Sequence, residues 1–403
     1  MTPTRVISLL DVDFYKLTMM QLAWKLHPDV VVKYEFINRD KTVKLGDLVN
    51  PYGLQVALLS AQSLRFTGGE LAYLRSLGIF AEDFLTWLVD FQLPPVKVAR
   101  TTDNQLSITT EGPWPVAILW ETIILSVVNE MYNQEYIDRS PLTLVRTVSE
   151  GLARLDAKME LLSKTPVSFT DFGTRRRFSH NWQGLVLDRL NLTSQNFGGT
   201  SNVFWAKELG INPVGTYAHE MDMVYCGMKP LFTYEEMKEA HLRMMDDWFA
   251  MYGAELSVAL TDTYGSDFFF DTIGTERLNQ WRGLRQDSGN PYIWATKAMT
   301  AFQEAGCDAK FKTLVFSDGL TVESIVGLDA MLHGDVIIRY GWGTDLMNDL
   351  GIRPLNIVMK AVEANGNGLV KLSDNMGKAL GPYPEEIARI KRLVSYKREE
   401  VPA

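Results

Sequence analysis

The sequence is poor in the residues that build disulfide frameworks and clustered metal sites. Its 403 residues include two cysteines, Cys226 and Cys307, and five histidines. Two cysteines cannot form a framework of several bridges, and they are too few for a cysteine-based metal centre. We therefore expect a chain that folds in a reducing compartment.

Long hydrophobic runs are also missing. Asp11 and Asp13 interrupt the short apolar run 6–10, so the N-terminus does not read as a signal peptide. No stretch approaches the roughly 18 uninterrupted apolar residues that a membrane span requires. The sequence predicts a cytoplasmic protein without a membrane partner.

A surplus of positive charge is the third absence. The formal net charge is −9, and the one dense cationic cluster is Arg175, Arg176 and Arg177. A nucleic-acid partner is not expected, because such proteins present a basic surface. Three arginines at one position suit a small phosphate or carboxylate ligand better.

Common nucleotide motifs are absent as well. No Gly-x-Gly-x-x-Gly opens a helix, and no Gly-x-x-x-x-Gly-Lys-Ser/Thr occurs. A dinucleotide-binding fold is therefore unsupported, and any nucleoside triphosphate must be held without a P-loop. A pair of acids followed by a Thr-Gly-rich phosphate loop is missing too.

What is present is an ordinary globular composition, with 46% apolar and 22% charged residues. The length suffices for one large domain and a smaller companion. The N-terminal part predicts a helix at 13–26, a strand at 30–38, a hairpin of 96–101 with 105–110, and a buried helix within 115–132. A domain boundary is expected near residue 130.

Beyond residue 130 a short apolar run, a polar cluster and a helical stretch alternate repeatedly. The apolar runs are 167–169, 213–217, 256–260, 283–284, 313–316 and 336–339. Helices are expected at 234–251, 291–304 and 322–332. This rhythm predicts a parallel sheet, and polar residues after each strand would converge at the C-terminal face of a barrel.

The C-terminal segment predicts a second hairpin. Segments 357–362 and 369–372 flank Asn365-Gly366-Asn367-Gly368, a strong turn signal. Residues 384–398 predict a closing amphipathic helix that begins with proline and two glutamates.

Two glycine-rich segments could bind an anion. Gly341, Gly343 and Thr344 offer backbone N–H groups and a hydroxyl after a predicted strand. Residues 196–201 precede a helix-like stretch at 202–209, whose N-terminus favours negative charge. Either segment alone could equally be a plain turn.

The polar strand ends contain further candidates. Asp262, Asp287 and Asp318 could each be a helix cap, but together they could bind ribose hydroxyls and a Mg²⁺ held by pyrophosphate. His219 is either a structural side chain or a catalytic one. Phe172 is either a core residue or a platform for a flat anionic ring.

These motifs together resemble the nicotinate phosphoribosyltransferases, which have the type II phosphoribosyltransferase fold. The resemblance runs from residues 9–16 to 375–378, nearly the whole chain. It is carried by the ordered set 170–177, 215–220, 284–291, 317–320 and 340–344. It implies an α/β fold with an irregular, incomplete (β/α) barrel at 131–354. It also implies a smaller α+β domain at 1–130, completed by about 355–403.

The resemblance further implies a role for each matching residue. In the pyridine site, Phe172 would stack on the ring, Tyr15 from a second subunit of a homodimer would close its other face, and Arg175 would face the carboxylate. Asp13, also from the second subunit, would help to fix the phosphates. The ribose-phosphate side would use Arg285, Asp262, Asp287, Asp318, Gly343 and Thr344. His219 would be phosphorylated by ATP, and Mg²⁺ would be held mainly by the phosphates of ATP and phosphoribosyl pyrophosphate (PRPP).

The implied reaction joins nicotinate to PRPP at the expense of ATP. Ser201 would donate to the nicotinate carboxylate, whereas the nicotinamide-using sister family carries an aspartate at the matching place. A simple helix-capping role for Ser201 is the alternative. A nicotinamide or quinolinate enzyme, or a non-catalytic metabolite-binding relative, remains a competing interpretation of the whole chain.

Overall fold

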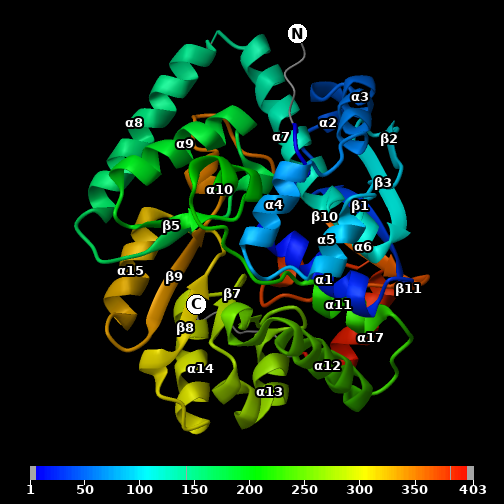
Figure 1. The fold of residues 1–403 in the computed structure, drawn as a ribbon, viewed down its shortest axis with the longest axis vertical. Coiled ribbons are helices and arrows are strands. Elements are labelled where there is room, and N and C mark those ends of the chain that lie inside the picture. The colour runs from blue at the N-terminus through cyan, green and yellow to red at the C-terminus, as the bar shows by residue number, and fades with distance from the viewer. Residues whose placement is uncertain (1–5, 142, 382, 397–403) are drawn as a thin grey trace.

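The computed structural model describes residues 6–141, 143–381 and 383–396. Their strands form two separate sheets, one antiparallel and one parallel. Figure 1 shows the antiparallel sheet on the right and the parallel strands β7, β8 and β9 on the left, with helices outside them. This mixed α/β architecture confirms the predicted fold class.

The antiparallel sheet combines the two ends of the chain. Its order is β11-β10-β1-β3-β2. The strands are β1 (Val31–Asn38), β2 (Val96–Arg100), β3 (Leu106–Pro113), β10 (Ile357–Ala364) and β11 (Asn367–Gly368). In β1, Val32, Tyr34 and Phe36 are buried while the residues between them are not, as the alternation of a half-buried strand requires. The predicted first hairpin is confirmed by the β2–β3 pairing.

Helices of the N-terminal part pack around this sheet. They are α1 (Phe14–Leu26), α2 (Leu45–Leu48), α3 (Pro51–Gln62), α4 (Gly68–Ser76), α5 (Glu82–Leu88), α6 (Trp114–Ala117) and α7 (Trp120–Arg139). Residues 114–139 are long and apolar enough to cross a membrane, but 89% of their most apolar window is buried inside the protein. They are a core element, as predicted. Helix α7 runs without a break through residue 130, where the domain boundary was expected. The division into two domains stays a prediction.

The parallel sheet has the order β5-β4-β9-β8-β7-β6. Its strands are β4 (Phe169–Asp171), β5 (Phe197–Thr200), β6 (Val258–Leu260), β7 (Gly283–Gln286), β8 (Thr313–Phe316) and β9 (Ile337–Trp342). The helices of this part are α8 (Leu144–Leu162), α9 (His180–Thr193), α10 (Val203–Leu209), α11 (Glu220–Gly227), α12 (Tyr234–Tyr252), α13 (Ser266–Gln280), α14 (Pro291–Glu304), α15 (Val322–Leu332) and α16 (Thr344–Met347). Short 3-10 turns are η1 (Thr174–Arg176), η2 (Gly253–Leu256), η3 (Ala309–Phe311) and η4 (Met376–Lys378).

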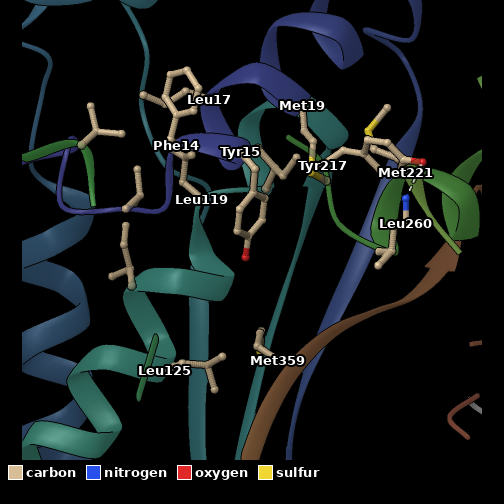
Figure 2. Close-up of a cluster of buried hydrophobic side chains, with 14 of the residues drawn as sticks. Phe14, Tyr15, Leu17, Met19, Leu119, Leu125, Tyr217, Met221, Leu260 and Met359 are labelled. Atoms are coloured by element: carbon tan, nitrogen blue, oxygen red, sulfur yellow. Dashed lines mark hydrogen bonds between the residues drawn. The ribbon is translucent and has the colours of Figure 1, made fainter. Parts of the chain in front are cut away.

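One predicted strand is wrong and one strand was missed. Residues 213–217 form only an isolated bridge between Pro213 and Thr200 of β5. At the other end of this segment, the Tyr217 hydroxyl accepts the N–H of Leu260 in β6 at 3.0 Å (Figure 2). The segment therefore spans the gap between the two edge strands without becoming a strand, which leaves the barrel incomplete.

The missed strand is β5, which the sequence presents as a glycine-rich loop. Gly199 has φ 125°, and a Cβ there would lie 2.5 Å from the carbonyl oxygen of Asn212. Close approach of Asn212 explains this glycine as a packing requirement, and the expected anion-binding role of residues 196–201 stays a prediction.

At the C-terminus, the predicted turn is confirmed at Asn365 and Gly366, both with positive φ. The second strand of this hairpin is shorter than the predicted 369–372 and begins nearer the N-terminus, because only Asn367–Gly368 pairs with β10. The closing helix α17 is Pro384–Leu393. The predicted end of that helix at residue 398 lies outside the described residues.

Candidate active site

The residues that directly follow the parallel strands lie at one edge of the sheet. Leu260 of β6 pairs with Arg285 of β7, and Phe316 of β8 pairs with Tyr340 of β9. Asp262, Asp287 and Asp318 follow these strands by one or two residues. Because all pairings are parallel, the three carboxylates lie at the C-terminal face, where barrel enzymes build their active sites.

His219 stands at the centre of this face, immediately before α11. Its Nε2 lies 2.9 Å from Asp287 Oδ2, 3.8 Å from Asp262 Oδ1 and 2.7 Å from Lys371 Nζ. Its side chain is 4% exposed. Burial and the charge of Lys371 lower the pKa of His219 to about 4, against the opposite effect of the two aspartates. At neutral pH the imidazole is therefore uncharged.

The three aspartates have different surroundings. Ser288 donates to Asp262, Ser317 Oγ donates to Asp287 Oδ1 at 3.0 Å, and Lys378 pairs with Asp318. Burial raises the pKa of Asp318, although Lys378 works in the other direction. Within the described part of the chain, no group of three His, Cys, Asp or Glu side chains is placed to hold a metal ion.

A second group of predicted residues surrounds Arg175 of η1. The guanidinium Nε lies 3.3 Å from Asp13 Oδ2, and Nη1 lies 3.0 Å from Glu121 Oε1. The guanidinium carbon also lies 5.6 Å from the centre of the Tyr15 ring, a cation–π distance. Although burial opposes it, the groups around Arg175 raise its pKa, so it remains a cation.

Asp13 and Tyr15 lie beside Arg175 of their own chain, and their expected supply by a second subunit stays a prediction. Both residues belong to the same chain as Arg175, and α1 is buried from Phe14 to Ala23. The Phe14 N–H donates to the Ser201 carbonyl at 2.6 Å, which fixes the start of α1 against the end of β5. The two residues reach Arg175 in cis because α1 folds onto the parallel sheet of its own chain.

Ser201 is also placed differently from both sequence interpretations. Asn202, not Ser201, caps α10 by accepting the Trp205 N–H at 3.0 Å. The Ser201 hydroxyl donates to Asp13 Oδ1 at 2.6 Å. Its single proton is therefore engaged by Asp13 and is not available to a ligand carboxylate in this arrangement.

Phe172 is half-buried and lies on Gly341. A Cβ at Gly341 would lie 2.3 Å from a ring carbon of Phe172, so only glycine leaves room for the ring there. Gly341 belongs to strand β9 and not to the loop after it, so only Gly343 and Thr344 remain as candidates for the predicted phosphate cradle. Gly343 and Thr344 lie at the start of the short helix α16, with Gly343 beside the Phe172 carbonyl.

Electrostatic contacts join the Arg175 group to the His219 group. Asp287 acts on the charge of Arg175, and Arg285 acts on the Tyr15 hydroxyl. Figure 2 shows Tyr15 extending from α1 with its hydroxyl directed away from Phe14 and Leu17. The Arg175 group and the His219 group are therefore near enough to influence each other's charges.

Arg176 of the predicted arginine cluster is joined in this region by three cations that were not predicted, Arg39, Lys360 and Lys371. Burial, the neighbouring Arg175 and Arg39 lower the pKa of Arg176 to about 10. Burial lowers the pKa of Lys360 to about 8, and nearby cations add to that effect. Arg39, Lys360 and Lys371 come from the antiparallel sheet or its continuation, far in sequence from the barrel strands. In the sequence, their basic character is the one feature that could have indicated a role for these three residues.

Three buried polar atoms of this region have no hydrogen-bond partner among the described residues. They are the Tyr15 hydroxyl, Asp262 Oδ1 and Arg285 Nε. Buried polar groups in native proteins are almost always paired, because an unpaired one costs about 1–3 kcal/mol. These three atoms are therefore able to pair with a polar ligand bound in this region.

Arg177, by contrast, is not part of the site. Its side chain is 0% exposed and its Nη2 lies 2.8 Å from Asp11 Oδ2. The cluster of three arginines is thus split between a ligand region and a structural ion pair.

Fold and site together define an enzyme of the α/β-barrel type with a cationic, phosphate-compatible active site. A model of the nicotinate phosphoribosyltransferase family matches residues 167–397, and one of that family's N-terminal domain matches residues 10–129. The chain belongs to the nicotinate phosphoribosyltransferase family.

Solved structures agree with this assignment. The nicotinate phosphoribosyltransferase from Porphyromonas gingivalis is 31% identical, with a TM-score of 0.87, and the match covers 97% of this chain and 100% of that one. The nicotinate phosphoribosyltransferase from Vibrio cholerae is also 31% identical, with a TM-score of 0.89, and the match covers 98% and 95%.

Proposed function

We propose that this protein transfers the phosphoribosyl group of PRPP to nicotinate and couples the transfer to ATP hydrolysis through His219. The overall reaction converts nicotinate, PRPP, ATP and water into nicotinate mononucleotide, pyrophosphate, ADP and phosphate. The observation that supports it most directly is the neutral, buried His219 between Lys371 and Asp287, in a cationic region of a chain that belongs to this family.

The transfer step displaces pyrophosphate from C1 of the ribose. Negative charge leaves with pyrophosphate while positive charge develops on the sugar, so the protein's task is positioning and charge stabilisation. Arg285 and Arg176 suit the pyrophosphate, since neither makes a side-chain hydrogen bond or ion pair with a described residue. Asp287 and Asp318 suit the ribose, with Gly343 and Thr344 at the 5-phosphate.

The ATP step requires a nucleophilic nitrogen and charge neutralisation around a phosphate. His219 Nε2 lies beside the Lys371 ammonium, which can neutralise an incoming γ-phosphate. Mg²⁺, when bound, would neutralise charge on the phosphates, and it would be held mainly by their oxygens with help from Asp262 or Asp287.

The pyridine ring would lie near Phe172, Tyr15 and Arg175. Phe172 offers a half-buried aromatic surface supported by Gly341, and Arg175, three residues further along the chain, remains charged. Burial holds the Tyr15 pKa above its ordinary value, so its hydroxyl stays neutral and can donate.

Asp13 and Tyr15 lie beside Arg175 of their own chain, and their supply to the active site of a second chain stays a prediction. A homodimer and a cytoplasmic location stay predictions.

The decisive experiment measures pyrophosphate release with nicotinate, nicotinamide and quinolinate, each with and without ATP and Mg²⁺. We expect turnover with nicotinate and a marked increase when ATP is present. Equal turnover with nicotinamide, or binding of PRPP without turnover, would contradict the proposal.

The phosphohistidine is tested separately. Incubation with γ-labelled ATP and Mg²⁺ should place acid-labile, base-stable phosphate on His219, and His219→Ala should lose ATP hydrolysis while keeping slow ATP-independent transfer. His333→Gln is the matched control, because its side chain is 62% exposed and lies far from the site in sequence. Phosphate that remains in His219→Ala would show the assignment to be wrong.

A further inference from the structure

Lys16 of α1 is a fully buried lysine that lies between two carboxylates. Its side chain is 0% exposed, and its Nζ lies 2.6 Å from Glu121 Oε2 and 2.6 Å from Glu220 Oε2. Lysine is almost never fully buried unless it is paired. Although burial opposes it, the two glutamates raise the pKa of Lys16, so the ammonium stays charged. The three side chains form a buried ion-pair group to which the proposed reaction has given no role.

Glu121 connects this group to Arg175. Its Oε1 accepts a hydrogen bond from Arg175 Nη1 at 3.0 Å, while its Oε2 pairs with Lys16. Glu121 lies in the first turn of α7, where a helix N-terminus favours negative charge. Although burial opposes it, Lys16 and the other nearby cations hold the pKa of Glu121 well below its usual range. One ionised carboxylate is therefore shared by two cations.

Glu220 of α11 holds the ammonium of Lys16 from the other side. Its Oε1 accepts the Tyr34 hydroxyl at 2.6 Å and the Trp114 Nε1–H at 2.7 Å. Its Oε2 accepts from Lys16. Because both oxygens of Glu220 are engaged, this carboxylate fixes the position of the Lys16 ammonium opposite Arg175.

The guanidinium of Arg175 is held at two of its three nitrogens. Nε lies 3.3 Å from Asp13 Oδ2, and Nη1 donates to Glu121. Nη2 makes no hydrogen bond with a described residue, and the side chain is 34% exposed. Nη2 is therefore the nitrogen that Arg175 can offer to a ligand.

The charges around Arg175 are balanced when Lys16 is counted. The linked ion pairs contain three carboxylates and three cations, namely Asp13, Glu121, Glu220, Arg175, Lys16 and Lys360. Without the charge of Lys16, this group carries a net negative charge beside the free nitrogen of Arg175. Such a group repels a ligand carboxylate, whereas a neutral ligand is much less affected.

We propose that Lys16 determines the specificity for an acidic pyridine, because it neutralises Glu121 and holds it against Arg175, so that Nη2 can bind the ligand carboxylate. Lys16 is a positioning residue in this proposal, since it acts through Glu121 and does not touch the ligand. The inference rests on the proposed function and names the feature that selects a carboxylate over the amide of the same ring.

The test compares the acid with its neutral analogue. In Lys16→Met, the KM for nicotinate should rise at least about tenfold, because Glu121 then repels the ligand carboxylate in a partly dry site. The inhibition constant of nicotinamide, which has the same ring without the charge, should change much less. A purely structural loss would weaken both together. An unchanged ratio of the nicotinate KM to the nicotinamide inhibition constant would overturn the proposal.

Two further variants separate charge from folding. Lys16→Gln keeps a hydrogen-bond donor in the buried position, and it carries the same test if Lys16→Met does not fold. Adding Glu121→Gln to Lys16→Met removes one charge of each sign and keeps an oxygen that can accept from Arg175. The selectivity for nicotinate should then recover most of its loss. A double variant no more selective than Lys16→Met would show that Lys16 does not act through Glu121, which also overturns the proposal.

Lys312→Met is the matched control for the loss of a buried lysine. Lys312 precedes β8, at the opposite end of that strand from Asp318, and its Nζ donates to three backbone carbonyls around the end of α13. The variant should have a lower melting temperature and an unchanged selectivity ratio. A shift in this ratio as large as that of Lys16→Met would show a general effect of destabilisation, and the proposal would be wrong.

The wild-type enzyme separates this inference from the proposed function. If the wild type turns over no nicotinate, the proposed function fails and the inference fails with it. If the wild type selects nicotinate and Lys16→Met selects it equally well, the inference alone fails.

Discussion

Arg176 and Arg177 are neighbours in the chain, yet their side chains have opposite surroundings. Arg177 is fully buried and binds Asp11 through its terminal nitrogens, and Asn202 and His180 also contact that carboxylate. Arg176 is half-buried, and other cations and burial together lower its pKa to about 10. The difference indicates that Arg177 maintains structure through its ion pair, whereas Arg176 has no such carboxylate partner in the described protein.

The largest effect is expected where the paired arginine is removed. Arg177→Met leaves the Asp11 carboxylate buried without its main partner, and should lower the free energy of unfolding by about 3–5 kcal/mol. Chemical denaturation measures this loss. Arg176→Met is the control and should change stability by less than about 1 kcal/mol. Equal losses in the two variants would contradict the comparison.

The converse experiment removes a cation that has no partner. Arg285→Met should lower kcat/KM for PRPP on the order of a hundredfold, because a charged donor to a phosphate is lost. Its melting temperature should not fall, since Arg285 Nε has no partner in the described protein. A large fall in stability together with unchanged kinetics would show that Arg285, like Arg177, is a structural residue.

A third prediction adds a negative charge to the ligand region. Ser201→Asp places a second carboxylate against Asp13, which now accepts the Ser201 hydroxyl at 2.6 Å. We expect kcat/KM for nicotinate to fall by at least about tenfold, because like charges repel strongly in a partly dry site. Ser201→Ala is the control and should be affected less. Unchanged nicotinate kinetics in Ser201→Asp would count against a pyridine site here.

A smaller effect is expected from pH. The pKa of Lys360 is lowered to about 8, so in the free enzyme its positive charge is lost as pH rises above that value. An anionic ligand favours the charged form, hence PRPP affinity should fall as pH rises through about 8. In Lys360→Met this part of the pH dependence should disappear. Calorimetric titration of PRPP between pH 7 and pH 9, on the order of one unit either side of that pKa, measures it.

The smallest effect is expected from mixing subunits. If Asp13 and Tyr15 serve the Arg175 of their own chain, combining inactive Tyr15→Ala with inactive Asp318→Ala should restore no activity. The mixture is assayed after subunit exchange has been allowed and checked by mass. Recovery toward the level of hybrid dimers would restore the shared-site interpretation.

The local elements were largely predictable because their signals are local. The bounds of α14 and α15 agree with the prediction, since Asn290 and Thr321 cap them and Pro291 begins α14. β5 was missed because glycines carry no strand pattern, and residues 213–217 were misread because an apolar run does not show whether it pairs. Proximity across the chain, such as Lys371 beside His219, has no local signal at all.

The sequence alone determined the alternating strand–helix order, the polar residues at the strand ends, and the family resemblance that these motifs carry. Tertiary structure alone decided which charges meet. It separated Arg177 from its neighbours, brought Asp13 and Tyr15 to Arg175 in cis, gave the Ser201 proton to Asp13, and placed Lys16 between two carboxylates. The physical reason is that pairing and burial depend on distances between residues far apart in the chain. Composition and periodicity do not contain those distances.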